Sequence, residues 1–277
     1  MANFEQIDRP PSEEAAAGEP LTVETAIAHL QGDDLGLRVY AAWWLGRFRV
    51  NDPVAVDTLI YALEDEADRT EAGGYPLRRN AARALGKLGD RRAVNGLIRS
   101  LDCSDYYVRE AAAQSLEMLG DASAISALIA LLETGLQDGK VQPPYDSQPY
   151  DAILEALGSL QATAAISVIQ PFLEHPTERV QYAAARAMYQ LTRESTYGER
   201  LVQALSGGTL QLRRAALADL GAIGYLQAAP AIAQTYAENS LKLISLKGLL
   251  EYSVRQHSGT FLSEDTLRII DLMDSLL

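Results

Sequence analysis

The sequence predicts an all-α protein, a superhelical solenoid (α-α superhelix) built from about seven similar helix pairs. Two observations predict this fold. A pattern of apolar and small residues with helical spacing recurs along the chain at intervals of 29 to 41 residues. In addition, 48% of the 277 residues are hydrophobic but only 7% are aromatic. Because each repeat of a solenoid buries its apolar face only on its neighbours, a chain of this length needs no single large core.

The recurring pattern describes the second helix of each pair. An apolar residue is followed by two small residues at positions i+4 and i+5, a leucine at i+8 and an apolar residue at i+11. The clearest copies are LRVYAAWWLGRF from Leu37, LRRNAARALGKLGD from Leu77 and VREAAAQSLEMLGD from Val108. Weaker copies begin at Pro149, Val180, Leu212 and Leu241. These positions form one stripe along a helix, and the small residues allow a neighbouring helix to approach closely. Two-helix repeats of this period are HEAT-like.

The first helix of each pair precedes the pattern and has its own apolar stripe, as in AVDTLIYALED and AISALIALLE. Gly89, Gly120 and Gly224 follow second helices, where a helix end favours a left-handed residue. Two insertions, Asp65–Tyr75 and Gly135–Gln148, separate the helices of the second and fourth pairs and explain the two longest intervals. Insertions in solenoids lie on one face, often the binding face.

The repeats are expected to span residues 21–255. Residues 1–20 are rich in Glu, Pro and Ala and are predicted to form a disordered N-terminal segment. Residues 256–277 are predicted to contain a terminal helix with Ser263 as its N-cap. The apolar stripe of this helix would cap the last repeat or dock on a partner.

Charge and composition limit the partners and the compartment. The chain has 37 acidic and 24 basic residues, a formal net charge of −13 at pH 7. This charge repels nucleic acid and anionic membranes at long range, so neither is an expected partner. The sequence shows no secretory signal and no apolar run of about 20 residues. Cys103 is the only cysteine, which excludes an intrachain disulfide. We therefore expect a soluble, cytoplasmic protein.

The same inventory excludes the common catalytic and metal sites. His29, His175 and His257 are the only histidines, and none belongs to an H-E-x-x-H or His-Glu metal motif. One thiol cannot build a cysteine zinc site, and no P-loop, dinucleotide fingerprint or G-x-S-x-G is present. We expect no metal and no tightly bound cofactor, and we expect His175, which precedes Pro176, to lie on the surface. Two classes of protein remain possible: a binding scaffold, and an enzyme that acts by positioning its substrates.

Three long strings resemble one protein family. They are AAWWLGRFRV (Ala41–Val50), LEDEADRTEAGGYPLRRNAARALGKLGD (Leu63–Asp90) and YYVREAAAQSLEMLGD (Tyr106–Asp121). They resemble the E subunit of the heterodimeric E/F-type phycobilin lyases, and the resemblance covers roughly residues 21–255. It implies a cyanobacterial lyase that attaches phycocyanobilin, its substrate, through a thioether bond to a cysteine of the phycocyanin α-subunit. The F-type lyase subunit and the apo phycocyanin α-subunit are the partners that the resemblance implies.

Thioether formation adds a thiol across the ethylidene group of an open-chain tetrapyrrole. The addition occurs spontaneously but gives mixed products, so a lyase must fix the bilin conformer and the approach of the thiol. Such a site needs cations for two propionates, a carboxylate near the pyrrole nitrogens and aromatic or apolar walls.

The candidate residues lie mainly on second helices, off the apolar stripe, because these helices usually line the concave face of a HEAT solenoid. Arg79, Arg83 and Arg186 are the predicted propionate anchors, Tyr40, Trp43 and Tyr182 are the predicted ring walls, and Asn80 shares their face. No catalytic motif is carried over from the family. Asp68 or Glu110 is the predicted carboxylate near the pyrroles and the candidate catalytic group.

Structural roles compete with these assignments. Trp43 and Trp44 would also serve to cap the first repeat, and the acidic insertion EDEADRTE would be no more than a solvated loop. Cys103 is either a transient bilin holder or a buried structural residue. For the whole protein, the alternatives are a non-catalytic HEAT-repeat scaffold or chaperone for an apo-phycobiliprotein, or a lyase for a related phycobiliprotein subunit.

Overall fold

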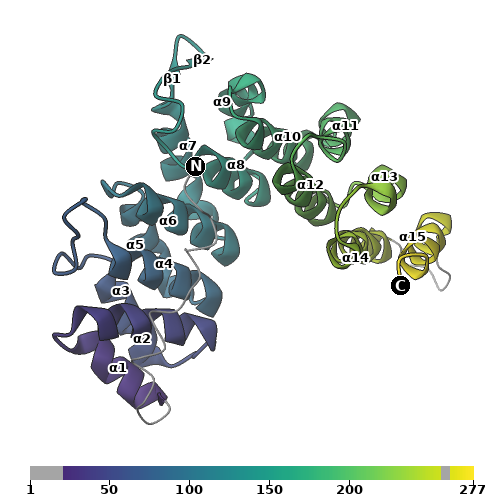
Figure 1. Ribbon diagram of the computed structural model, residues 1–277. Helices are drawn as coiled ribbons and strands as arrows, with labels where there is room; N and C mark the ends of the chain where they lie inside the picture. Colours follow the sequence, from purple (N-terminus) through teal and green to yellow (C-terminus); the bar gives the residue numbers. More distant parts are fainter. Residues whose placement is uncertain (1–20, 257–262) are drawn as a thin grey trace. The chain divides into compact units, whose positions relative to one another are not determined.

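The computed structural model describes residues 21–256 and 263–277. The predicted disordered segment, residues 1–20, lies outside these described residues. The chain separates into two compact units, residues 1–128 and 129–277, which are described one at a time. In each unit, successive helix pairs stack on one another (Figure 1), which confirms the predicted all-α solenoid class.

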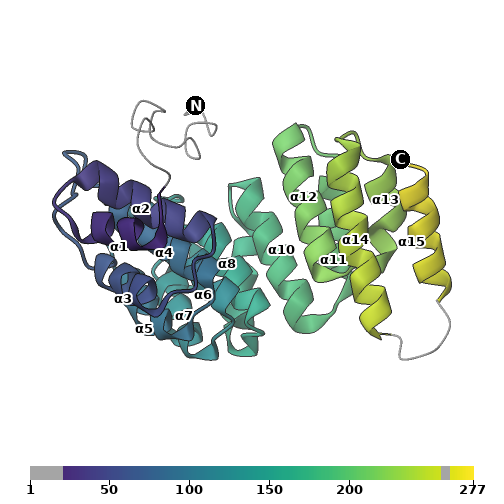
Figure 2. The same cartoon turned by 90° about the horizontal axis from the view of Figure 1, so that it is seen from below.

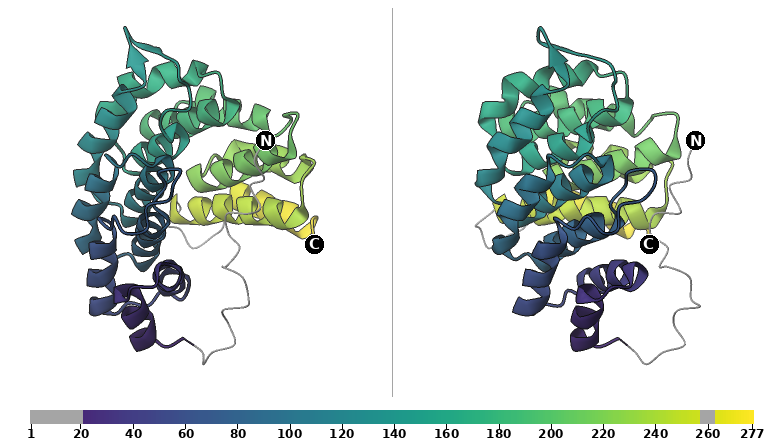
Figure 3. Two further views of the ribbon diagram at one scale, coloured as in Figure 1. Left: turned by 60° about the vertical axis from the view of Figure 1, so that its left-hand side comes forward. Right: turned by 90° about the vertical axis from the view of Figure 1, so that its left-hand side faces the viewer.

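The first unit contains three helix pairs. Its helices are α1 (Val23–Gln31), α2 (Leu35–Arg47), α3 (Pro53–Ala62), α4 (Pro76–Leu88), α5 (Val94–Ser100) and α6 (Tyr106–Leu119), and the unit boundary falls within α7 (Ile125–Glu133). Short 3-10 helices occupy Arg91–Ala93 and Ala122–Ala124. The second helices α2, α4 and α6 pack side by side. Figure 3 shows first and second helices of this unit as two layers.

The second unit continues the same construction. It contains α8 (Tyr150–Ser159), α9 (Ile166–Ile169), α10 (Glu178–Thr192), α11 (Ser195–Ala204), α12 (Leu210–Ile223), α13 (Ala229–Gln234), α14 (Asn239–Gln256) and α15 (Glu264–Asp274). Short 3-10 helices occupy Thr163–Ala165, Gln170–Glu174 and Leu226–Ala228. Helices α10, α12 and α14 lie side by side in Figure 2, and α8 packs against α10.

Small residues set the spacing between neighbouring second helices, as the sequence pattern predicts. Ala81 and Ala82 of α4 are completely buried. A β-carbon placed on Gly86 of the same helix would lie 2.9 Å from the Cα of Ser115 in α6. The two backbones therefore approach more closely than any larger residue allows at this position.

The helix ends also follow the sequence prediction. Gly89, Gly120 and Gly224 have φ values of 74°, 63° and 67° and end α4, α6 and α12 in the left-handed conformation. Ser263 is the N-cap of α15 and accepts a hydrogen bond from the Thr266 amide. Helix α15 packs against α13 and α14 of the second unit.

The first insertion is tied to the helices of its unit at specific points. Most residues of EDEADRTE are exposed, as expected of a solvated loop, but Asp65 is half-buried and Asp68 is buried. Asp65 forms an ion pair of 2.5 Å with Arg38, and Arg78 donates a hydrogen bond of 2.6 Å to the Asp65 carbonyl oxygen. The Tyr75 hydroxyl donates to Glu66 at 2.9 Å. Arginines from α2 and α4 draw the acidic residues inward because each provides several donors for carboxylate and carbonyl oxygens.

The second insertion carries the only strands among the described residues, a hairpin of β1 (Leu136–Gln137) and β2 (Lys140–Val141). Beyond the hairpin, the Tyr145 ring lies 5.8 Å from the ring of His175. His175 is 0% exposed, and its Nδ1 accepts a hydrogen bond from the Thr177 amide. The predicted surface position of His175 is therefore wrong, because the insertion and the Tyr150 ring cover it.

Candidate functional site

Six of the predicted site residues lie on three neighbouring helices of the first unit. They are Tyr40 and Trp43 on α2, Arg79, Asn80 and Arg83 on α4, and Glu110 on α6. We call this surface the arginine face. On α4 it lies opposite the buried stripe that contains Leu77, Ala81 and Leu85, because residues three and four apart share one side of a helix. The structure thus places these six residues on three second helices that pack side by side.

Arg79 is a half-buried cation with no ion pair among the described residues. Its Nε is buried and has no hydrogen-bond partner in that part of the chain. Its guanidinium carbon lies 5.9 Å from the centre of the Tyr107 ring. Burial, and secondarily the like charge of Arg83, lower the pKa of Arg79. The charges of Asp105 and Glu110 oppose this effect. A half-buried arginine that makes no ion pair favours an anionic ligand, because a bound carboxylate would supply the close partner that it lacks.

The neighbours of Arg79 on α4 contact both adjacent second helices. Arg83 is 3.9 Å from Glu110 of α6. Asn80 donates a hydrogen bond of 3.3 Å to the Val39 carbonyl oxygen and so ties α4 to α2. On α2, the rings of Tyr40 and Trp43 stack with their centres 5.6 Å apart and an interplanar angle of 26°.

The two tryptophans of the first unit have different surroundings. Trp43 belongs to the arginine face, whereas Trp44 packs on Phe48 with ring centres 5.0 Å apart. Phe48 is 61% exposed. Of the two, only Trp43 is stacked with another candidate residue, so Trp43 is the one that fits a ring wall.

Asp68 has a structural task that the sequence did not indicate. Its side chain is buried and accepts a hydrogen bond of 2.5 Å from the Leu77 amide, near the first turn of α4. Tyr75, the N-cap residue of that helix, provides no side-chain cap. Burial, and to a lesser extent the charge of Asp65, raise the pKa of Asp68. The structure therefore gives Asp68 the role of a helix cap, and Glu110 is the candidate carboxylate that lies beside Arg83.

Tyr182 and Arg186 belong to the second unit, on α10. Tyr182 lines a polar cavity of about 670 Å³ between α10 and α11, together with Gln181, Ser195, Thr196, Glu199, Arg200 and Gln203. Arg186 forms ion pairs with Glu155 at 3.3 Å and with Asp219 at 3.2 Å. Unlike Arg79, Arg186 already has counter-ions.

Comparison with known proteins decides the family. Residues 74–139 match a model of HEAT repeats, and residues 37–65 match a model of the PBS lyase HEAT-like repeat. The chain is 66% identical to the phycocyanobilin lyase subunit alpha of Microchaete diplosiphon over 264 residues, which cover 93% of this chain and 90% of that protein. The chain belongs to the phycocyanobilin lyase alpha subunit family. This result confirms the resemblance predicted from the sequence.

Two further comparisons agree with this assignment. A structure of the complex of CpcE and CpcF of phycocyanin lyase from Nostoc sp. PCC7120 contains a chain that is 64% identical. It matches with a TM-score of 0.85 over 94% of this chain and 97% of that one. The bilin biosynthesis protein PecE from Nostoc is less similar, with 47% identity over 86% of this chain and 90% of that protein.

This lyase-family chain also contains a charged cluster that sequence reasoning missed. Arg179 of α10 lies 2.9 Å from Asp219 of α12 and 3.6 Å from Asp151 of α8, and it also forms an ion pair with Glu155 of α8. Arg186 contacts both Glu155 and Asp219. We call these five residues the ion cluster. Asp219 could have indicated this cluster from the sequence. It is a charged residue at repeat position i+7, where the repeat that begins at Leu77 has the small apolar residue Ala84.

Other chemistry-bearing residues are accounted for by local contacts. The Sγ of Cys103 is half-buried and lies 4.0 Å from a nitrogen of Arg78. In the part of the chain that the structure describes, no three His, Cys, Asp or Glu side chains are grouped so that they would hold a metal ion. In the same residues, every helix is too short or too polar to cross a membrane.

Proposed function

We propose that this chain is the E-type subunit of a heterodimeric lyase, active with an F-type partner, that attaches phycocyanobilin through a thioether bond to a cysteine of the phycocyanin α-subunit. The observation that carries the proposal is the half-buried Arg79, whose buried Nε has no hydrogen-bond partner among the described residues and whose guanidinium carbon lies 5.9 Å from the Tyr107 ring centre, in a chain 66% identical to a phycocyanobilin lyase subunit alpha. The match to a chain of the CpcE and CpcF complex supports the heterodimer. Phycocyanobilin is substrate rather than resident cofactor, and the compartment is the cytoplasm.

The arginine face supplies the groups that a bilin needs. Arg79 and Arg83 bind the propionates, since guanidinium groups pair with carboxylates through two parallel hydrogen bonds. The stacked rings of Tyr40 and Trp43 form a wall for the tetrapyrrole. Glu110, which lies 3.9 Å from Arg83, accepts hydrogen bonds from pyrrole N–H groups.

The chemical step needs positioning more than it needs a strong catalyst. The thiol sulfur forms a bond to the ethylidene carbon, the carbon–carbon double bond becomes single, and the thiol proton ends on the adjacent ring carbon. Every atom of both reactants stays in the product, so no oxidant or reductant is required. Holding bilin and thiol in one geometry selects a single product from those that the free reaction gives.

The first test is co-expression of this chain with the F-type partner, a bilin-producing system and the apo phycocyanin α-subunit. We expect a covalent, zinc-fluorescent band on the α-subunit in a denaturing gel, and only when both lyase chains are present. If all components are soluble and no band forms, the proposal is wrong. If this chain then binds the apo-subunit without attaching bilin to it, the chain is a scaffold. A fluorescent band on a different acceptor subunit would identify a related lyase.

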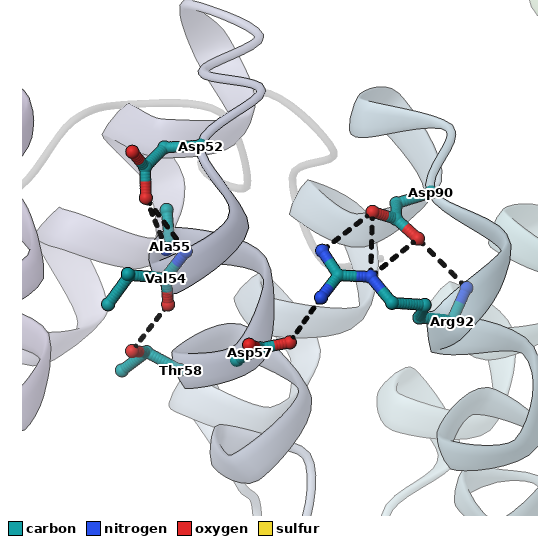
Figure 4. A network of polar contacts seen from close by, with 7 residues as sticks. All are labelled: Asp52, Val54, Ala55, Asp57, Thr58, Asp90 and Arg92. Carbon is teal, nitrogen blue, oxygen red and sulfur yellow. Dashed lines mark hydrogen bonds and ion pairs between the residues drawn. The ribbon is translucent and has the colours of Figure 1, made fainter.

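The second test addresses the arginine face. The double substitution Arg79→Ala and Arg83→Ala should abolish bilin transfer and leave the circular dichroism spectrum and the thermal midpoint close to those of the unmodified protein. Arg92→Ala is the matched control, because Arg92 also belongs to the first unit but already has counter-ions, Asp57 at 2.6 Å and Asp90 at 2.8 Å (Figure 4). Retained transfer by the double variant would refute the assignment of the anchors.

A further inference from the structure

The arginine face continues toward the C-terminal ends of its helices, where it holds two more cations. Arg47 follows Trp43 by one turn of α2, and Lys87 follows Arg83 by one turn of α4. Residues four apart share one side of a helix, so Arg47 and Lys87 lie on the side that carries the candidate residues. They occupy the same repeat position, i+10, on two second helices that pack side by side. Lys87 thus places a second positive charge about 6 Å beyond Arg83 along the helix axis.

Both cations are exposed, and within the described part of the chain neither side chain makes an ion pair or a hydrogen bond. Arginines at position i+1 of the same two helices are in a different state. Arg38 is paired with the Asp65 carboxylate, and Arg78 donates to the Asp65 carbonyl oxygen. The partial negative charge at the end of each helix stabilises Arg47 and Lys87 without occupying their donors. These donors therefore remain available to an anion from outside the chain.

The charge of the arginine face indicates which anion this is. With all groups ionised, Arg79, Arg83 and Glu110 together carry a net charge of +1. That charge balances one carboxylate, whereas a bilin carries two propionates, on neighbouring pyrrole rings. Arg47 and Lys87 raise the net charge of the face to +3, in a chain whose overall charge is −13. The extended face therefore holds enough positive charge for both propionates.

We infer that Arg47 and Lys87 form a second anion subsite of the arginine face, which binds one propionate of the bilin while Arg79 and Arg83 bind the other. This inference rests on the proposed function. The two subsites follow one another along α4, so the two rings that carry propionates lie about one helical turn apart over this helix. A tetrapyrrole held at two points cannot turn about a single carboxylate, and its orientation toward the attacking thiol is fixed.

An absorbance titration tests the subsite without reference to the attachment reaction. Phycocyanobilin, and in a separate series its dimethyl ester, is added to the full heterodimer in the absence of the acceptor subunit. The double substitution Arg47→Ala and Lys87→Ala should raise the dissociation constant of phycocyanobilin on the order of 10-fold, because the charge-assisted hydrogen bonds to one carboxylate are lost. The dissociation constant of the dimethyl ester should be the same for both proteins, because its esterified propionates carry no charge.

Two further variants control for charge and for side-chain identity. Arg91→Ala with Arg99→Ala removes the same two charges from the first unit, but from exposed residues outside the arginine face that already have carboxylate partners. This variant should change the dissociation constant of phycocyanobilin by less than about 2-fold. Arg47→Lys with Lys87→Arg keeps both charges and should recover most of the affinity. All three variants should keep the thermal midpoint of the unmodified protein, because the substituted residues are exposed.

The outcomes separate the inference from the proposed function. If the Arg47→Ala, Lys87→Ala variant binds phycocyanobilin as tightly as the unmodified heterodimer, the inference fails and the lyase function stands. If that variant then needs a higher concentration of the apo α-subunit for transfer, the two cations bind the acceptor protein instead. An equal loss of affinity for the dimethyl ester, or an equal loss in the Arg91→Ala, Arg99→Ala control, would show that the two cations do not contact a propionate, and the inference fails. If the unmodified heterodimer binds no bilin and forms no adduct, the proposed function fails, and the inference falls with it.

Discussion

Replacing Arg79 with methionine should stabilise the isolated chain and at the same time abolish bilin attachment. Arg79 is half-buried, its Nε has no hydrogen-bond partner among the described residues, and the adjacent Arg83 adds repulsion. Methionine has a similar length and fills the same space beside Tyr107 without a charge. A residue retained at a cost to stability is expected where its function lies in binding a ligand.

The size of the effect follows from the one unsatisfied donor. A buried donor without a partner costs about 1 to 3 kcal/mol. The rest of the guanidinium is partly hydrated, which places Arg79 at the lower end, so Arg79→Met should raise the free energy of unfolding by about 1 kcal/mol. In a chain of this size that gain corresponds to a rise of about 2 to 4 °C in the thermal midpoint.

Urea unfolding followed by circular dichroism measures the stability, and the zinc-fluorescent band measures the attachment. Arg83→Met is the matched control one helical turn away. Its side chain is 28% exposed and lies 3.9 Å from Glu110, so its removal should change the free energy of unfolding by no more than about 0.5 kcal/mol. An Arg79→Met variant that unfolds more easily than the unmodified protein and still attaches bilin would refute the reasoning about Arg79.

Three further substitutions test the helix packing, the cap and the ion cluster. Gly86→Val should destabilise the protein by about 2 kcal/mol in urea unfolding, because a β-carbon there lies 2.7 Å from that of Ser115; unchanged stability would contradict the close approach of α4 and α6. Asp68→Ala should cost about 1 kcal/mol through loss of the cap on α4, and equal stability of the two proteins would count against that role. The folded chain keeps the Glu155 proton up to about pH 7, whereas the unfolded chain releases it near the ordinary value of 4.5. As the pH rises between these two values, the free energy of unfolding should therefore fall more steeply in the unmodified protein than in Glu155→Gln. The difference in slope should reach up to about 1.4 kcal/mol per pH unit, and parallel curves would disprove the raised pKa.

The fold was predictable because each of its determinants is local. The apolar stripe and the small residues Ala81 and Ala82 mark the buried side of α4 within one helical turn of each other. Gly89 and Gly120 mark helix ends because the left-handed conformation is costly for other residues. The same arrangement recurs in successive helix pairs, and this repetition strengthens the prediction of a solenoid.

One wrong expectation and one incomplete expectation concern residues whose environment comes from elsewhere in the chain. His175 lies in a polar, proline-containing sequence that is typical of a surface turn, but the ring of Tyr145, 30 positions earlier, covers it. Asp65 lies in an acidic run, but Arg38 of α2 reaches it across 27 positions. A periodic pattern within one helix does not predict either contact, because neither contact is made within a single helix or between equivalent positions of two repeats.

The arginine assignments show how the candidate site could have been predicted more sharply. Arg83 and Arg186 occupy the same repeat position, i+6, yet only Arg186 lies between two carboxylates. In the repeats before and after Arg83, position i+6 holds Trp43 and Gln114, which are uncharged; before Arg186 it holds Glu155. Equivalent positions of adjacent second helices lie side by side. A cation whose neighbours at the same repeat position are uncharged therefore remains available for a ligand, whereas a cation next to a carboxylate is neutralised within the protein. Comparing charge between neighbouring repeats, rather than collecting arginines along one face, separates a candidate anion site from a structural ion cluster.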